Sequence, residues 1–83
     1  MSSNTETRVC RLVGDILGVP VAGISRATSH EDVPAWDSLN IVKLAMAVEA
    51  EFRVHITPDD AVSFTSVQAI IDILARKENQ VTR

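Results

Sequence analysis

The chain has 83 residues, 46% of them hydrophobic, and its formal net charge is −3. This length suits one small domain with a single modest core, and it leaves little room for an enclosed catalytic cleft. The eight basic residues are scattered, which excludes nucleic acid as the main partner because phosphate binding needs clustered Lys and Arg.

The first predicted element is an amphipathic helix over about residues 4–17. Ser3 and Glu6 have the spacing of a capping box, and Gly18 offers a left-handed cap at the far end. Cys10 flanks the apolar stripe, so we expect a half-buried, unreactive thiol. The stripe itself has helical spacing and consists of Val9, Leu12, Val13, Ile16 and Leu17.

The N-terminal residues give no indication of a targeting segment. They lack the basic start and apolar core of a signal peptide, and no apolar run in the chain reaches membrane-spanning length. One cysteine cannot form an internal disulfide, which fits a reducing compartment. We therefore expect a cytoplasmic monomer that forms a single domain over residues 1–83.

Residues 18–36 form a long connection without a sustained hydrophobic period. A loop of this length is unusual in a compact domain unless it packs on the core or serves a site. Ile24, Val33 and Trp36 are its expected anchors. His30 lies in a polar patch, and we expect it to be solvated.

The second predicted helix covers about residues 40–52, and Asp37 and Ser38 stand where the loop becomes this helix. Either side chain can cap the free backbone N–H groups. If Asp37 is the cap, Ser38 is the first helical residue and its hydroxyl is free in solvent. A phosphoester there would lie at the positive end of the helix dipole.

This second helix carries two apolar strips. The first faces the core and contains Ile41, Leu44, Ala45, Val48 and Phe52. The second strip consists of Leu39, Val42 and Met46. It packs against a further helix in one interpretation, and in the other it stays exposed as a docking surface beside Ser38.

Two more helices are expected in the C-terminal third. Thr57 and Pro58 begin a helix of one or two turns, with His55 partly buried before it. Thr65 and Gln68 have the spacing of a capping box for a last helix over about residues 66–77. The polar residues 78–83 are expected to fray. The predicted fold is all-α: a small four-helix bundle of three main helices and a short third one.

The order of these elements is similar to that of the acyl carrier protein family, from about Val9 to Leu74. Each matching motif is weak alone, whereas their order and spacing together are specific. The motifs are Ile16-Leu17-Gly18-Val19, Asp37-Ser38-Leu39, Val48-Glu49-Ala50-Glu51-Phe52, Ile56-Thr57-Pro58-Asp59-Asp60 and Thr65-Ser66-Val67.

The resemblance implies a role for Ser38. In this family the corresponding serine receives 4′-phosphopantetheine from coenzyme A through a separate phosphopantetheinyl transferase, and the arm carries an acyl group as a thioester. Ser38 would be an attachment point, and the chain a carrier without catalytic or metal-binding residues. The residues agree, because no histidine, carboxylate pair, metal cluster or Gly-rich loop stands out around Ser38.

The resemblance also implies partners of three kinds. These are the transferase, an acyl-loading ligase or acyltransferase, and a ketosynthase or another acyl-processing enzyme of fatty acid, polyketide-type or specialised biosynthesis. We expect weak docking through the apolar strip, with an acidic contribution from Asp37, Glu49 and Glu51. The acyl chain is expected between the second helix and the long loop, near Ile41, Ala45, Ala61 and Ile70.

The sequence departs from the family in its charges. Carriers of fatty acid synthesis often have acids at the positions of Asn40, Lys43 and Ala50. A tryptophan directly before the Asp-Ser-Leu motif, as Trp36 is here, resembles the sequences of discrete carriers of secondary metabolism. These departures favour a specialised pathway. Two alternatives remain: an aminoacyl or aryl carrier of the peptidyl or D-alanyl type, and a small helical adaptor that carries no cofactor.

Overall fold

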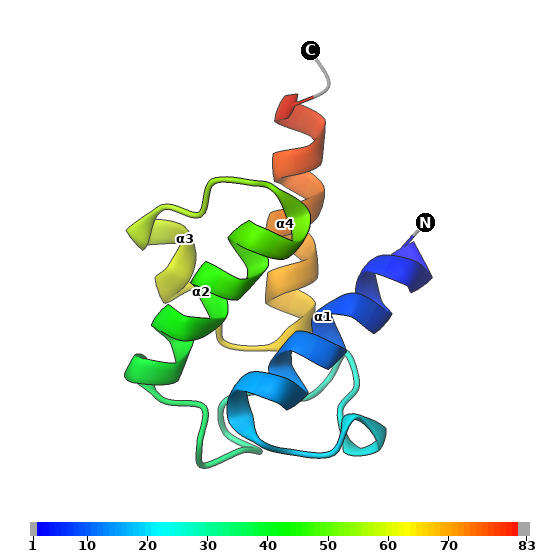
Figure 1. Cartoon of the computed structure of the whole chain (residues 1–83), viewed down its shortest axis with the longest axis vertical. Helices are drawn as coiled ribbons and strands as arrows, with labels where there is room; N and C mark the ends of the chain where they lie inside the picture. Colours follow the sequence, from blue (N-terminus) through cyan, green and yellow to red (C-terminus); the bar gives the residue numbers. More distant parts are fainter. Residues whose placement is uncertain (1, 82–83) are drawn as a thin grey trace.

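A computed structural model describes residues 2–81, and within that range the regular structure is entirely helical (Figure 1). In Figure 1 the start of α1 and the end of α4 lie in the upper part of the view, whereas the long loop runs along the bottom and α2 begins just above it. The all-α prediction is confirmed. The elements are α1 Ser2–Leu17, the 3-10 helix η1 Val21–Gly23, α2 Ser38–Phe52, α3 Pro58–Val62 and α4 Val67–Val81.

The α1, α2 and α4 helices enclose one apolar core. Leu44 and Val48 of α2 belong to the same buried cluster as residues of both other long helices. None of the α3 residues is fully buried, so α3 covers the edge of the core and does not form part of it. The most deeply buried side chains are Val9, Val13, Leu44, Val48, Phe64, Val67, Ile70 and Leu74.

The C-terminal end of α1 agrees with the prediction, and its N-terminal end does not. Gly18 has φ of +72° and its N–H donates to the Gly14 carbonyl at 2.8 Å, which confirms the left-handed C-terminal cap. The helix begins at Ser2, so the capping box predicted for Ser3 and Glu6 is wrong. No proline or glycine interrupts residues 2–8, and the helix therefore continues past Ser3.

The last helix is longer than predicted. It continues to Val81, four residues beyond the expected end at Lys77. Residues 75–80 are Ala, Arg, Lys, Glu, Asn and Gln, and all but Asn are strong helix formers. The end of the tail that we expected to fray, residues 82–83, lies outside the described residues.

The long loop is fastened to the core at three points, as predicted. Ile24 and Val33 are partly buried against it, and Trp36 is buried with 4% exposure. Backbone bonds also join the loop to the start of α4, including Val67 N to the Thr28 carbonyl at 3.0 Å. Ser29 and Ser66 form an isolated antiparallel bridge at the same place. The loop is therefore a structural part of the bundle.

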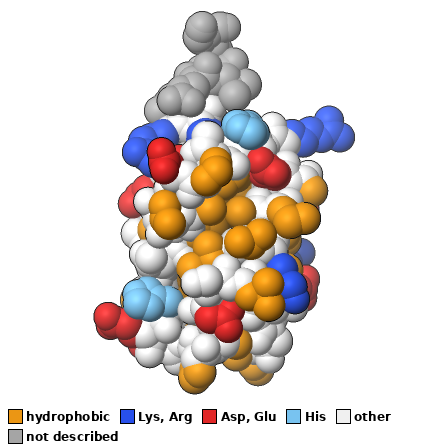
Figure 2. Space-filling view, turned by 90° about the vertical axis from the view of Figure 1, so that its left-hand side faces the viewer, with side chains coloured by type: hydrophobic (Ala, Val, Ile, Leu, Met, Phe, Trp, Pro, Cys, Tyr) orange, Lys and Arg blue, Asp and Glu red, His pale blue; other side chains and the backbone are white. Residues whose placement is uncertain are grey.

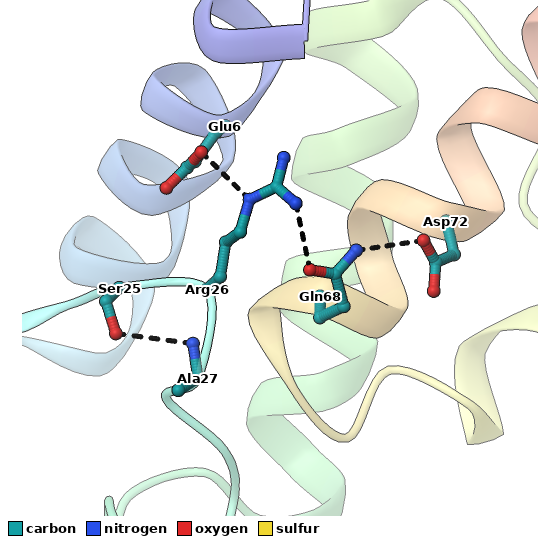
Figure 3. A network of polar contacts seen from close by, with 6 residues as sticks. All are labelled: Glu6, Ser25, Arg26, Ala27, Gln68 and Asp72. Atoms are coloured by element: carbon teal, nitrogen blue, oxygen red, sulfur yellow. Dashed lines mark hydrogen bonds and ion pairs between the residues drawn. The ribbon is translucent and has the colours of Figure 1, made fainter.

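Arg26 connects three segments through its side chain (Figure 3). Its Nε donates to Glu6 Oε1 of α1 at 3.0 Å, and one terminal nitrogen donates to Gln68 Oε1 of α4 at 3.1 Å. Gln68 in turn donates to Asp72 at 2.9 Å, one turn along α4. Glu6 thus holds the loop, and it does not cap the start of α1.

A second arginine joins α1 to the end of α2. Arg8 Nε donates to Glu51 Oε2 at 3.0 Å, and its Nη2 donates to the Glu51 backbone carbonyl at 3.0 Å. The same guanidinium lies 4.3 Å from the centre of the Phe52 ring. Because one side chain contacts a carboxylate, a carbonyl and a ring, it fixes the C-terminal turn of α2 against α1.

Cys10 lies on the core side of α1 and is 6% exposed, so it is more buried than the half-buried thiol we predicted. Burial raises the pKa of this thiol, and the nearby Glu6 carboxylate raises it further. A thiol held protonated in an apolar site is a poor nucleophile. This agrees with the expectation that Cys10 is unreactive.

Candidate functional site

The site is built at the start of α2, where Asp37 is the N-cap. Asp37 has extended backbone angles, and its carboxylate accepts from Asn40 N at 3.0 Å. Ser38 is therefore the first helical residue, as it must be if Asp37 takes the capping role. Its side chain is exposed, and its hydroxyl has no hydrogen-bond partner among the described residues.

Two side chains hold the loop that leads into this cap. Asn40 Nδ2 donates to the Ala35 carbonyl at 2.7 Å, and the buried Trp36 Nε1 donates to the Phe64 carbonyl at 3.0 Å. The first bond ties the loop to α2, and the second ties it to the segment before α4. Ser38 is thus presented by a rigid junction, although the residue itself is exposed.

The backbone around Ser38 suits a phosphate group. The N–H groups of Ser38 and Leu39 have no acceptor among the described residues, because they belong to the first turn of α2. Free N–H groups and the positive end of a helix dipole favour an anion at this point. A phosphoester on the Ser38 oxygen would lie in solvent beside them, so the residues present fit such a group.

Leu39, Val42 and Met46 form an exposed apolar strip along α2, and Val62 of α3 extends it. Their exposures are 65%, 54%, 63% and 71%. Figure 2 shows hydrophobic side chains gathered in the middle of this face, with charged side chains around them. No further helix covers this strip among the described residues, so of the two interpretations that the sequence allowed the structure agrees with the exposed one.

The acidic rim of this strip is weaker than the sequence suggested. Glu49 accepts from Ile56 N at 2.7 Å and lies 3.5 Å from His55 Nδ1, so its carboxylate binds the segment after α2. Asp37 remains exposed while capping α2. Lys43 is exposed and has no charged or hydrogen-bonding partner among the residues described.

The prediction that His55 is partly buried is wrong, because its side chain is 83% exposed.

An open hollow of about 430 Å³ lies beside Ser38, between α2 and α3. Ile41 and Ala61, two of the residues predicted to receive an acyl chain, line it. The other two, Ala45 and Ile70, are buried in the core beneath and are not among its lining residues. The lining consists of Ser38, Ile41, Val42, Pro58, Ala61 and Val62.

The surroundings of Ser38 contain no group that would activate its hydroxyl. No His or carboxylate hydrogen-bonds to it among the side chains that the structure describes, and serine nucleophiles need such a base. Among the described side chains, which are those of residues 4–77, no cluster of three His, Cys, Asp or Glu residues could hold a metal ion. No helix within residues 2–81 is long and apolar enough to cross a membrane.

The comparisons with known proteins agree with this geometry. A family model described as "Phosphopantetheine attachment site" matches residues 7–74. The "Acyl carrier protein" of Buchnera aphidicola subsp. Schizaphis graminum (strain Sg) is 35% identical over 78 residues, which cover 94% of this chain and 99% of the relative. The chain belongs to the acyl carrier protein family.

A solved structure shows the same fold for an acyl carrier protein. The "Solution structure of the apo doublet acyl carrier protein from prodigiosin biosynthesis" superposes with a TM-score of 0.74 at 17% sequence identity. The superposition covers 92% of this chain and 37% of that chain. At this identity the likeness supports the fold and says nothing about cargo.

Membership of the acyl carrier protein family identifies the cofactor and the type of activity. The chain is a non-catalytic carrier whose prosthetic group is a covalent 4′-phosphopantetheine arm. Members of the family are modified by a phosphopantetheinyl transferase and presented to acyl-processing enzymes. When bound, the arm supplies a thiol that holds the acyl group as a thioester.

Sequence reasoning missed the residues that position the site. The bonds from Asn40 to Ala35 and from Trp36 to Phe64 join segments whose proximity has no periodic pattern. A polar residue at the third position of a helix, three residues after the cap, is a partial indication of such a role for Asn40. The sequence pattern did not indicate the hydrogen bond that the Glu49 carboxylate accepts, because the donor is a backbone N–H seven residues away.

Proposed function

We propose that this acyl carrier protein carries its 4′-phosphopantetheine arm on Ser38 and presents acyl groups to the enzymes of a specialised biosynthetic pathway. The observation that carries the proposal is the exposed Ser38 hydroxyl, which has no partner among the described residues and lies at the first position of α2 beside an apolar hollow. An arm at this position keeps the thioester within reach of successive enzymes without requiring tight binding.

The docking surface in this proposal is the strip of Leu39, Val42 and Met46, extended by Val62. Exposed apolar side chains beside the attachment point provide the centre of a transient interface. Asp37 contributes a negative charge near the arm, whereas Glu49 contributes less because its carboxylate is bonded within the chain. A surface with few free acids supports partners other than those of general fatty acid synthesis.

The hollow supports an acyl cargo over an aminoacyl one. Its lining is apolar apart from Ser38, and no carboxylate faces it that could accept a bond from an ammonium group. An uncharged alkyl chain gains free energy by leaving water there, while a charged amino group would lose its hydration without a partner. Octanoyl loading is therefore expected to shift the NMR signals of Ile41 and Ala61, and alanyl loading is not. Equal shifts for both groups would contradict this choice of cargo.

The attachment site is tested by intact-mass measurement. Incubation with coenzyme A, Mg²⁺ and a broad-specificity phosphopantetheinyl transferase is expected to add the mass of one phosphopantetheine group. Ser38→Ala should abolish the addition, and Ser63→Ala should retain it. Ser63 is a matched control because it is also exposed, and its hydroxyl makes no hydrogen bond within the described part of the chain.

Either of two results would overturn the proposal. An unmodified mass in the native chain would favour the adaptor alternative, in which the apolar strip acts alone. Modification that persists in Ser38→Ala would move the arm to another residue. Circular dichroism of both variants checks that the fold is retained, since a surface serine is expected to contribute little to stability.

A further inference from the structure

The α3 helix forms one wall of the hollow but has little to hold it in place. Pro58, Ala61 and Val62 face Ile41 and Val42 of α2 across the hollow. The helix has five residues, none of them fully buried, and a helix this short is not stable on its own. Its position therefore depends on the packing of the partly buried Ala61 against the core and on the polar contacts of its first turn.

The polar contacts of α3 converge on one carboxylate. Asp60 N donates to Thr57 Oγ1 at 3.1 Å, and Thr57 N donates to Asp60 Oδ2 at 3.1 Å, which closes a capping box. Lys77 of α4 donates to the same Asp60 oxygen, with Nζ to Oδ2 at 2.6 Å. Asp60 thus joins the start of α3 to the last helix.

This ion pair is more sheltered than an ordinary surface pair. The side chains of Lys77 and Asp60 are 18% and 17% exposed, whereas the Arg8 and Glu51 side chains are 36% and 41% exposed. Partial shielding from water strengthens a charge pair, because solvent screens it less. The bond from Lys77 and the capping bonds lower the pKa of Asp60 to about 2, so the carboxylate is charged at neutral pH.

We propose that Lys77 is a positioning residue for the cargo: by holding α3 to α4 through Asp60, it limits how far the hollow opens and hence how long an acyl chain it shelters. The proposal rests on the function proposed for Ser38. Lys77 lies on α4 and is not among the residues that line the hollow. Lys77 therefore affects the cargo indirectly, through the position of α3.

The test compares Lys77→Met with the native protein, each loaded with butanoyl, octanoyl or dodecanoyl phosphopantetheine. Methionine keeps an apolar chain of similar length and removes the charge. Amide hydrogen exchange at Ala61 and Val62 is expected to accelerate roughly threefold to fivefold, the factor for losing a partly shielded pair. Hydrolysis of the dodecanoyl thioester should slow relative to the butanoyl thioester, because a looser wall admits the longer chain.

Two matched variants separate positioning from general stability. Lys77→Arg restores a cation and is expected to restore the native chain-length profile. Arg76→Met removes a neighbouring exposed cation that has no partner among the described side chains, and it should leave the profile unchanged. Amides of α1 should exchange at the native rate in all variants.

Three outcomes would overturn the proposal. The first is native exchange at Ala61 and Val62 in Lys77→Met, and the second is an equal change for all three chain lengths, which indicates a structural role only. The third is the same effect in Arg76→Met. Failure of the native protein to accept the arm at Ser38 would overturn the carrier role itself, and the mass measurement distinguishes that failure from the other three.

Discussion

Asn40 makes two bonds that define the geometry around the attachment point. Its backbone N–H donates to the Asp37 carboxylate, and its side-chain amide donates to the Ala35 carbonyl. Carriers of fatty acid synthesis often have an acid where this chain has Asn40. A carboxylate cannot donate a hydrogen bond, so the local structure requires the amide of Asn40. The asparagine therefore has a structural role in addition to removing a negative charge from this position.

We predict that Asn40→Asp destabilises the protein by about 1 kcal/mol. The carboxylate loses the bond to Ala35 and faces a carbonyl oxygen, a cost of about 1–2 kcal/mol, and a favourable interaction of about 0.5 kcal/mol with the helix dipole offsets part of it. Urea denaturation followed by circular dichroism measures the difference. Asn4→Asp, an exposed substitution near the start of α1, is the control for the added charge. A native or higher stability for Asn40→Asp would contradict this account.

At the scale of the element, the contact between α1 and the loop after it depends on Gly14. A Cβ atom at this position would lie 2.9 Å from the Val19 carbonyl oxygen and 3.1 Å from Val21 Cγ2. From its sequence position alone, a glycine inside a helix indicates only a weaker helix. The structure shows that its missing side chain lets the loop cross close to α1, so the two segments pack without a gap.

We predict that Gly14→Ala destabilises the protein by about 1 kcal/mol. Alanine is the better helix former by about 1 kcal/mol, but displacing a backbone carbonyl costs about 1–3 kcal/mol, and the steric term prevails. Gly23→Ala is the control, since a Cβ there meets nothing within 4 Å. Thermal unfolding should show a lower Tm for Gly14→Ala and a near-native Tm for Gly23→Ala. A Gly14→Ala protein that is more stable than the native one would show that the loop moves away at little cost.

The helices were predictable from sequence, and their polar connections were not. The apolar spacing of Val9, Val13, Leu44 and Val48 reflects burial, which repeats along a helix and is therefore visible in the chain. A bond such as that from Trp36 to Phe64 joins residues 28 positions apart through a single atom pair. Nothing periodic marks such a bond, so it emerges only when the elements are placed.

The candidate site shows the same division. The local pattern at the start of α2 left two choices open: Asp37 or Ser38 as the cap, and a packed or an exposed strip. The structure shows Asp37 as the cap, with Ser38 and the strip exposed. The hollow depends on the packing of α3 against α2. Of the four residues predicted near the acyl chain, Ile41 and Ala61 line it, and Ala45 and Ile70 are buried in the core. Tertiary placement of a five-residue helix is not encoded in its own sequence pattern.

At the scale of the whole molecule, Asp60 makes the stability sensitive to acid. Its pKa is about 2 in the folded chain against an ordinary value of 3.8, mainly because of the bond from Lys77 and then the capping bond from Thr57. A lowered folded-state pKa stabilises the protein above the ordinary pKa, and this contribution is lost as the pH falls through the folded value. The affected range is therefore about pH 4 to pH 2.

We predict that Asp60→Asn is less stable than the native protein at pH 7 by about 1.5–3 kcal/mol, the usual contribution of a hydrogen bond to a charged group. Asparagine keeps an acceptor for the Thr57 N–H and removes the charge that Lys77 pairs with. Urea denaturation at several pH values should show the difference shrinking between pH 4 and pH 2. Asp59→Asn, at the exposed position directly before Asp60, is the control for removing an acidic side chain. A difference that persists unchanged at pH 2 would rule out the charge of Asp60 as its cause.

The burial of Cys10 has a consequence for the fate of a thioester. An acyl group on sulfur transfers readily to another thiolate, and Cys10 is the single cysteine of the chain. Because that sulfur is covered by the core and kept protonated, the protein has no internal competitor for the activated group that it transports. For the same reason, a thiol-selective alkylating reagent applied to the native holo form would label the thiol at the tip of the prosthetic arm and leave Cys10 unmodified.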